Sequence, residues 1–329
     1  MNILLDKNKP FFKANLHCHS TYSDGKESVE ELKRQYKRQG YSIVAFTDHE
    51  HLIDNSPLND EEFLAITACE LAIKEFPEQS TMKNFDMRVC HLNLYSLDPH
   101  NTLTPCYSPI QDHFISDTCR HLIRYDTAYE RVYSKEGIND IIRIANEQGF
   151  LVTYNHPTWS LETANEYLQY DNLFAVEIYN HGCNRMGARV DDERVFDDML
   201  RAGKRLFCVC ADDNHTAEDS FGGWVCVNAE KLDYTTIMTA LRNGQFYAST
   251  GPQIFALTQD GMQVEVYTSP CKTIGVTTHG RRTDGVCAND GELLTHAKFT
   301  LRPEDKYFRI RVTDKYGKTA YTQAYPLQK

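Results

Sequence analysis

Short apolar runs alternate with amphipathic stretches over roughly the first 250 residues, and this rhythm constrains the fold more than any other feature. Ser42–Phe46 is a β-branched apolar run, typical of a buried parallel strand. The stretch before it, Val29–Gln39, has helical spacing, with Ser28 as its cap and Gly40 after its end. Repeated strand–helix–strand units predict a parallel sheet, and about this many units favour a barrel.

The same rhythm marks further elements along the chain. Besides Ser42–Phe46, the predicted strands are Phe12–Leu16, Leu64–Thr67, Val89–Leu94, Phe150–Tyr154, Ala175–Tyr179, Arg205–Cys210 and Phe246–Ser249. Besides Val29–Gln39, the predicted helices are Lys135–Gln148, Asp191–Ala202 and Leu232–Asn243. The stretches Glu78–Asp86 and Asp98–Asp112 are expected to be loops over the mouth of the barrel.

From about Gly251 the helical spacing stops and alternating segments such as Phe308–Val312 and Thr319–Tyr325 appear, with a turn at 314–317. Alternation of this kind predicts antiparallel strands. We therefore expect residues 1–250 to form the barrel and residues 251–329 to form a small β-sandwich-like domain, in which no chemical motif is visible.

Composition excludes several classes of partner. The net charge is −11 and no basic run is present, which argues against nucleic-acid binding. The 11 cysteines are scattered without a CxxC pair, which favours reduced thiols and a cytoplasmic location. The first nine residues contain Lys and Asp and no apolar h-region, and no apolar stretch is long enough for a membrane span, so neither a secretory signal nor a membrane partner is expected. The oligomeric state is left open.

Histidines and carboxylates follow nearly every predicted strand of the first part. His17 and His19 are spaced i, i+2, which puts both rings on one face of a strand, able to chelate one metal ion. Since the carboxyl ends of parallel strands meet at one mouth, we expect all these groups to converge. The candidate metal ligands are His17, His19, Asp24, His49, Glu70, His91, His156, Asp213 and His215.

Nine donors are too many for one tetrahedral zinc ion and suit two or three divalent ions that share carboxylates. Three such ions with three carboxylates would give the site a net charge of about +3. Such a site would attract anions although the protein as a whole is acidic. A small phosphorylated substrate fits this charge. Mixed nitrogen and oxygen ligands suit zinc, manganese and iron alike, so the sequence does not choose the metal.

The motifs LHCHSTYSDG at 16–25, TDHE at 47–50, NHP at 155–157 and DNH at 213–215 resemble those of the PHP (polymerase and histidinol phosphatase) superfamily, over roughly residues 11–250. The resemblance implies an α/β fold, a distorted (β/α)7 TIM-like barrel with a small C-terminal antiparallel β domain, and a trinuclear metal site. DSFGGW at 219–224, FYASTGP at 246–252 and the β-rich tail look like the stand-alone CehA/McbA-like branch.

The resemblance also implies which donors share an ion. The first metal would be held by His17, His19, Glu70 and Asp213. The second would be held by Asp24, His49 and His215. The third would be held by Glu70, His91 and His156.

Further residues are candidates for catalysis. His181 is a candidate general acid, and Arg185, with Arg189, is a candidate phosphate ligand. Asp48 precedes a predicted ligand and is expected to orient it. The expected reaction is phosphoester hydrolysis, in which a metal-bridged hydroxide attacks phosphorus.

Two alternatives stay open: hydrolysis of a non-phosphate ester or carbamate, and a non-catalytic metal-binding accessory module. Arginines at the mouth would favour phosphate, whereas apolar walls would favour uncharged esters.

Overall fold

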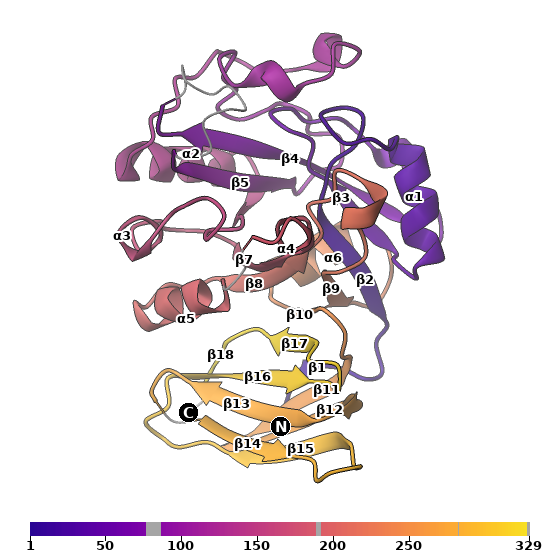
Figure 1. Cartoon of the computed structure of the whole chain (residues 1–329), viewed down its shortest axis with the longest axis vertical. Coiled ribbons are helices and arrows are strands. Elements are labelled where there is room, and N and C mark those ends of the chain that lie inside the picture. The colour runs from indigo at the N-terminus through magenta and orange to yellow at the C-terminus, as the bar shows by residue number, and fades with distance from the viewer. Residues whose placement is uncertain (77–86, 189–191, 282, 328–329) are drawn as a thin grey trace.

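The computed structural model describes residues 1–76, 87–188, 192–281 and 283–327, and Figure 1 shows a helix-covered N-terminal part above a β-rich C-terminal part. The strands of the N-terminal part are β2 (Phe11–Cys18), β3 (Ile43–Phe46), β4 (Leu64–Lys74), β5 (Val89–Ser96), β6 (Phe150–Tyr154), β7 (Ala175–Asn180), β8 (Phe207–Ala211), β9 (Trp224–Asn228) and β10 (Phe246–Ser249). The predicted loop Glu78–Asp86 lies outside the described residues.

The longer helices form where the apolar spacing predicts them, whereas two short helices, Ala164–Tyr167 and His181–Arg185, were not predicted. They are α1 (Val29–Arg38), α2 (Lys135–Glu147), α3 (Ala164–Tyr167), α4 (His181–Arg185), α5 (Glu193–Arg201) and α6 (Tyr234–Arg242), with 3-10 turns η1 (Ser56–Leu58), η3 (Asp112–Phe114), η4 (Arg120–Leu122) and η5 (Ala217–Asp219). Helix α1 begins at the predicted cap, because the Ser28 side chain accepts a hydrogen bond from the Glu31 amide. No helix in the described part of the chain is both long and apolar enough to cross a bilayer.

The α/β fold class is confirmed, but the sheet is not parallel throughout. β2, β3 and β4 pair in parallel, as do β6, β7 and β8, whereas β5 runs antiparallel to both β4 and β6. A parallel neighbour needs a crossover, usually through a helix, and no helical pattern separates β4 from β5. The expectation that every one of these strands ends at the same edge is therefore wrong for β5, which begins there.

The described strands do not close into a complete hydrogen-bonded ring. The pairing runs β10-β9-β2-β3-β4-β5-β6-β7-β8. The gap between β8 and β2 is narrowed by a bridge between Cys18 and Asn214. There the Asp213 amide donates to the His17 carbonyl at 2.9 Å, and the His19 amide donates to the Asn214 carbonyl at 3.2 Å. These bonds bring two distant ligand motifs together.

The C-terminal strands form an antiparallel sandwich with its own core. They are β11 (Ile254–Asp260), β12 (Gln263–Cys271), β13 (Thr273–Thr278), β14 (Thr283–Cys287), β15 (Leu294–Thr300), β16 (Tyr307–Thr313), β17 (Thr319–Thr322) and β18 (Tyr325–Pro326). The N-terminal strand β1 (Asn2–Leu5) pairs with β11, so residues 2–5 lie in this part rather than with residues 11–250. β17 pairs with β10, which makes the two parts continuous by hydrogen bonding.

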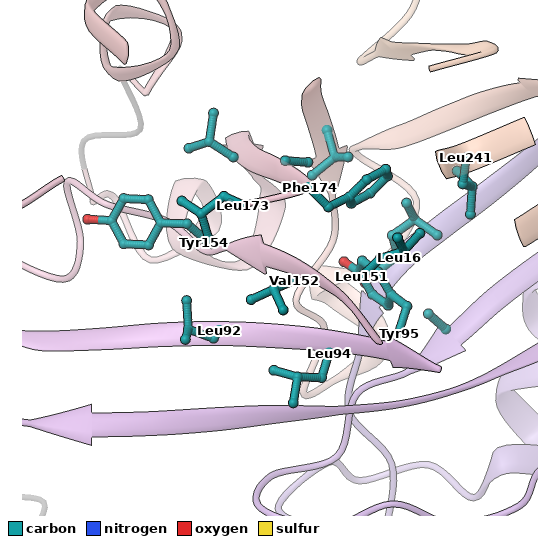
Figure 2. Packing of buried hydrophobic residues seen from close by; sticks show 14 of the residues in the cluster. Leu16, Leu92, Leu94, Tyr95, Leu151, Val152, Tyr154, Leu173, Phe174 and Leu241 are labelled. Atoms are coloured by element: carbon teal, nitrogen blue, oxygen red, sulfur yellow. The ribbon is translucent and has the colours of Figure 1, made fainter. Parts of the chain in front are cut away.

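Apolar side chains of the N-terminal strands, together with those of helices α2, α5 and α6, form the larger core. Figure 2 shows Leu92 and Leu94 of β5 facing Val152 of β6, with Leu173 and Phe174 beyond them. Burial of this apolar surface is the main stabilising contribution to the fold. A second apolar cluster, which includes Leu5, lies between the two C-terminal sheets. The polar residues that follow the strands are thus held at the rim of a rigid core.

Candidate metal centre

His17 and His19 present their rings to the same side, as their spacing predicts. Their Nε2 atoms lie 3.2 Å apart, and Asp213 Oδ1 lies 3.1 Å from each of them. Around an ion with four ligands at about 2.0–2.1 Å, neighbouring donor atoms stand roughly 3.3 Å apart. The triangle of two imidazole nitrogens and one carboxylate oxygen therefore has the size of one face of a metal coordination shell.

Glu70 is the hub of the cluster. It lies inside β4 rather than at its end, and it is 1% exposed. Its Oε1 lies 3.3 Å from His17 Nε2, 3.1 Å from His91 Nδ1 and 3.4 Å from His156 Nε2. Its Oε2 lies 3.1 Å from His49 Nδ1 and 3.5 Å from His19 Nε2. A carboxylate with five imidazoles around its two oxygens is placed to bridge ions.

The Asp24 carboxylate lies among three histidine rings. Its Oδ1 lies 3.6 Å from His49 Nε2 and 3.5 Å from His215 Nε2, and 3.9 Å from His19 Nδ1. This buried oxygen has no hydrogen-bond partner among the described residues. His19, Asp24, His49 and His215 could together hold one ion, which adds His19 to the set that the family resemblance implies for the second metal.

His91 reaches the cluster because β5 is reversed. It is the third residue of its strand and pairs with Ala72 of β4, two residues beyond Glu70. Its buried Nδ1 makes no hydrogen bond within the described part of the chain. His17, Glu70 and His156 could together hold a further ion. His91 Nδ1 lies 3.1 Å from Glu70 Oε1, so the group of Glu70, His91 and His156 that the resemblance implies stays a prediction.

Two of the donors sit on unusual backbone. Asp213 has φ +52° and His156 has φ +26°, both in the region that non-glycine residues avoid. Asp213 lies beyond the end of β8, and its side chain and that of His215 both reach the cluster. Backbone strain of this kind is typical of functional sites.

The charges in the cluster favour bound cations. Burial lowers the pKa of His17, yet the carboxylates of Asp213 and Glu70 outweigh it and raise the pKa well above its ordinary value. Burial raises the pKa of Glu70, yet the His91 and His17 rings hold it well below its ordinary value. For His49, burial is likewise outweighed, by Asp24 and Glu70, and the pKa rises to about 9. The carboxylates thus stabilise positive charge at His17 and His49, whereas burial lowers the pKa of His19 and His91.

Buried groups behind the donors fix their orientation, and sequence reasoning missed the most important one. Glu177 of β7 is buried, and its Oε1 lies 3.1 Å from His17 Nδ1 while its Oε2 accepts the His156 amide. Asn155 donates to Glu70 Oε1 at 2.8 Å, and Asn180 donates to both Glu177 and Asp213. The available signal was a single acidic residue inside an apolar strand.

Asp48 orients a loop rather than the neighbouring His49. Its carboxylate accepts hydrogen bonds from the amides and hydroxyls of Ser20 and Ser23. These bonds fix the turn that carries Asp24. Asp48 is therefore a positioning residue for the first ligand loop, and it lies outside the three donor groups.

The remaining catalytic candidates do not line the cavity described next. His181 is half-buried, its Nδ1 lies within hydrogen-bond distance of the Tyr179 hydroxyl at 3.0 Å, and a Cβ at Gly222 would collide with its ring. Arg185 is exposed at the end of α4. Arg189 lies outside the described residues. Catalytic roles for His181 and Arg185 stay predictions.

A cavity of about 450 Å³ opens over the donors. Seven of the nine donors line it, whereas His17 and His19 are fully buried. The other described lining residues are mainly apolar or aromatic and include Met87, Val89, Phe114, Trp159, Cys183 and Met186, with Lys74, His113, Gly182 and Asp219. Sequence reasoning identified none of these walls, because they come from loops and strand extensions without a motif.

The donor set fits divalent metal ions. Two buried donor atoms, Asp24 Oδ1 and His91 Nδ1, lack hydrogen-bond partners in the described part of the chain. A buried polar atom without a partner costs free energy that a bound cation would offset. Imidazole and carboxylate ligands, with second partners such as Glu177 behind His17, are the usual surroundings of zinc, manganese or iron.

Similar solved structures are distant. One is a two-domain protein described as containing a predicted PHP-like metal-dependent phosphoesterase, from Bacteroides vulgatus, with 14% identity and TM-score 0.48, covering 97% of this chain and 96% of that one. Another, described as a candidate metal-dependent phosphoesterase from Bifidobacterium adolescentis, has 14% identity and TM-score 0.37. The match covers 71% of this chain and 96% of that one. An amidohydrolase from Chromobacterium violaceum with bound sulfate and no metal has 13% identity and TM-score 0.39, with the same coverage.

Likenesses at these values identify no activity, and no curated protein matches the sequence. The PHP domain family matches residues 15–176, which contain seven of the nine donors. The remaining two, Asp213 and His215, lie outside the match but are in the same cluster. The family and the donor cluster together support a metal-dependent hydrolase. The chain therefore contains a domain of the PHP family.

Proposed function

We propose that this protein hydrolyses small phosphate esters with the help of two or three divalent ions held by the nine donors. The observation that carries the proposal is Glu70, whose two oxygens face five imidazoles in a buried cluster at the base of a cavity. One carboxylate with this many nitrogen donors around it suits a multinuclear site better than a single ion.

The ligand groups follow from the contacts. One ion would be held by His19, Asp24, His49 and His215, and the others by groups that share His17, namely His17, His19 and Asp213, and His17, Glu70 and His156. The ninth donor, His91, would join at Glu70, since its Nδ1 lies 3.1 Å from Glu70 Oε1. When bound, divalent ions supply an activated water and electrostatic stabilisation of the phosphoryl oxygens.

The protein's own contribution is orientation and exclusion of water. Glu177 fixes the ring of His17, and Asp48 fixes the turn that carries Asp24. Because donors such as Glu70 are almost fully buried, charges interact strongly there and need little rearrangement during reaction. We further propose a cytoplasmic location, because ten of the 11 cysteines are buried and all are unpaired.

A second candidate function is hydrolysis of a carboxylic ester or carbamate. The walls of the cavity favour it, because its described lining is largely apolar and contains no arginine, with Lys74 as its only lysine. The same donors would then serve attack at carbon instead of phosphorus.

The test is metal analysis of the purified protein followed by assays with zinc, manganese or iron. Release of inorganic phosphate from a panel of small phosphate monoesters is compared with release of acid from matched carboxylic esters and carbamates. Glu70→Gln should lose bound metal and turnover, whereas Glu62→Gln, at an exposed position, should retain both. Turnover of carbon esters alone would favour the second candidate, and protein without metal or turnover would contradict both.

A further inference from the structure

The cavity extends outward from the donors along one face of β4 and β5. Glu70, Ala72 and Lys74 are every second residue of β4, so they lie on the same face of the strand. The antiparallel register places Ala72 opposite His91 and Lys74 opposite Val89. Four residues of strand span about 13 Å, so Lys74 lies well beyond the length of a phosphate group from Glu70. The space between them is available for the rest of a substrate.

Two aromatic side chains stand directly beside the donor rings. Phe114 of η3 packs on His49 with ring centroids 5.0 Å apart. Trp159 packs on His156 at 4.9 Å and on His91 at 5.7 Å. Both line the cavity and are only partly buried, so each has a ring surface that a bound molecule could cover. Any group attached to an anion at the donors would meet these rings first.

The rest of the described wall is mainly apolar, although Asp219 and His113 also line it. Met87, Val89 and Cys183 line it, and so does Met186, whose surface is 70% exposed although it is a large apolar side chain. Flexible thioethers adapt to apolar ligands of varied shape. The cationic group there, the Lys74 ammonium, lies 3.3 Å from the His113 ring nitrogen, at the far end of the apolar stretch.

We propose that the cavity is a subsite for the alcohol portion of the ester and that this portion is aromatic or apolar, of about the size of a benzyl group. The inference rests on the proposed phosphoesterase function. In the reaction, the oxygen of water bonds to phosphorus, the P–O bond to the alcohol breaks, and the apolar alcohol leaves with a proton. Phe114 and Trp159 contact the apolar group while the donors hold the phosphoryl end.

The first experiment compares kcat/KM for benzyl phosphate and glycerol 1-phosphate, two monoesters of primary alcohols that differ in the polarity of the leaving alcohol. A benzyl preference of about tenfold or more is expected, the usual range for filling an apolar pocket. Equal efficiency, or a preference for the glycerol ester, would overturn the subsite while leaving phosphoester hydrolysis intact.

The second experiment measures binding without turnover. In a Trp224→Phe protein, Trp159 is the single tryptophan, and its fluorescence in metal-loaded protein reports on the cavity. Benzylphosphonate should bind about tenfold more tightly than methylphosphonate and should change the emission. If no phosphate ester is hydrolysed but this preference holds, the proposed function fails and the subsite stands. Equal affinities would reject the subsite.

Matched variants locate the effect. Phe114→Ala should reduce the benzyl-to-glycerol ratio several-fold, whereas Phe255→Ala, a partly exposed phenylalanine of β11, should leave it unchanged. Metal content is measured in parallel, because Phe114 packs on His49. Met186→Ser, which removes an exposed side chain away from the donor rings, should lower the same ratio with full metal content. An unchanged ratio in both cavity variants would overturn the assignment.

Discussion

At the scale of single residues, Glu177 is a buried carboxylate that orients two proposed metal ligands, His17 and His156, without being a ligand itself. One of its oxygens holds the Nδ1 side of His17, and the other accepts the amide of His156. This leaves the Nε2 atom of His17 directed at Glu70 and Asp213. A carboxylate behind a ligating imidazole fixes the ring and raises its basicity.

Glu177→Gln should therefore weaken metal binding by about 10–100-fold without unfolding the protein. The amide keeps the size of the side chain but loses the charge and one acceptor. Metal affinity is measured by competition with a chelator, with Glu230→Gln, an exposed site, as the control. Unchanged affinity would show that His17 is oriented without Glu177.

Glu162 is a second buried acid, and it is not one of the proposed metal ligands. Its oxygens accept hydrogen bonds from the hydroxyls of Tyr133, Tyr154 and Tyr170. Burial raises the pKa of Glu162, and these hydrogen bonds only partly oppose the shift. The folded state therefore binds this proton more tightly than the unfolded chain does.

Stability should accordingly fall as pH rises from the ordinary glutamate pKa of 4.5 through the higher pKa of the folded state. This part of the stability is fully present below 4.5 and is lost above the folded-state pKa. Thermal unfolding of Glu162→Gln between pH 4 and 8 should show a smaller decline than the wild type, while Glu61→Gln, at an exposed site, should follow the wild type. Parallel curves for all three proteins would contradict the assignment.

At the scale of elements, the turn after β2 is built on close backbone approach. A Cβ at Gly25 would lie 2.5 Å from the His19 carbonyl oxygen, closer than atoms can pack. Only glycine lets the chain pass here while Asp24 faces the rings of His49 and His215. The SDG sequence thus supplies both the glycine that the turn requires, Gly25, and the proposed metal ligand, Asp24.

Gly25→Ala should destabilise the fold by about 1–3 kcal/mol, the usual cost of overpacking, and should weaken the group around Asp24. The control is Gly275→Ala in β13, where the nearest atom would be 3.6 Å from the new methyl group and the backbone needs no adjustment. Denaturant unfolding and metal titration check both effects. If both variants behave alike, the close approach does not matter.

At the scale of the whole molecule, Arg309 connects the two parts. It lies on β16 with its side chain 2% exposed, and its guanidinium donates to Asp197 and Glu193 of α5. Gln323 adds a second connection, because its side chain exchanges hydrogen bonds with the backbone of Cys208 in β8. Together with the β10–β17 pairing, these contacts favour unfolding of both parts as one unit.

Arg309→Leu should lower stability by about 3 kcal/mol, because two partly buried carboxylates lose their cation. Arg311→Leu should cost under about 1 kcal/mol, since that side chain is 46% exposed and its ion pair is weak. Calorimetry of the wild type should give one transition with equal calorimetric and van't Hoff enthalpies. Two separate transitions, or similar losses in both variants, would show that the parts are energetically independent.

The secondary-structure elements and the types of donor could be predicted from local patterns in the sequence. Apolar spacing and caps act over a few residues, so the main helices and most strands form where they are predicted. The positions of His17, His19 and Glu70 in short motifs likewise marked the donors, because a chelating pair is a local pattern.

The direction of β5, the place of β1 and the walls of the cavity depend on long-range packing and could not be predicted. Long-range packing also brought Glu177 to His17 across 160 residues of chain and set the aromatic rings of Phe114 and Trp159 beside the donors. These features depend on contacts between distant segments, for which local patterning carries no signal. The ligands of the site can therefore be predicted from the sequence. The orientation of their side chains and the shape of the cavity depend on packing between distant segments.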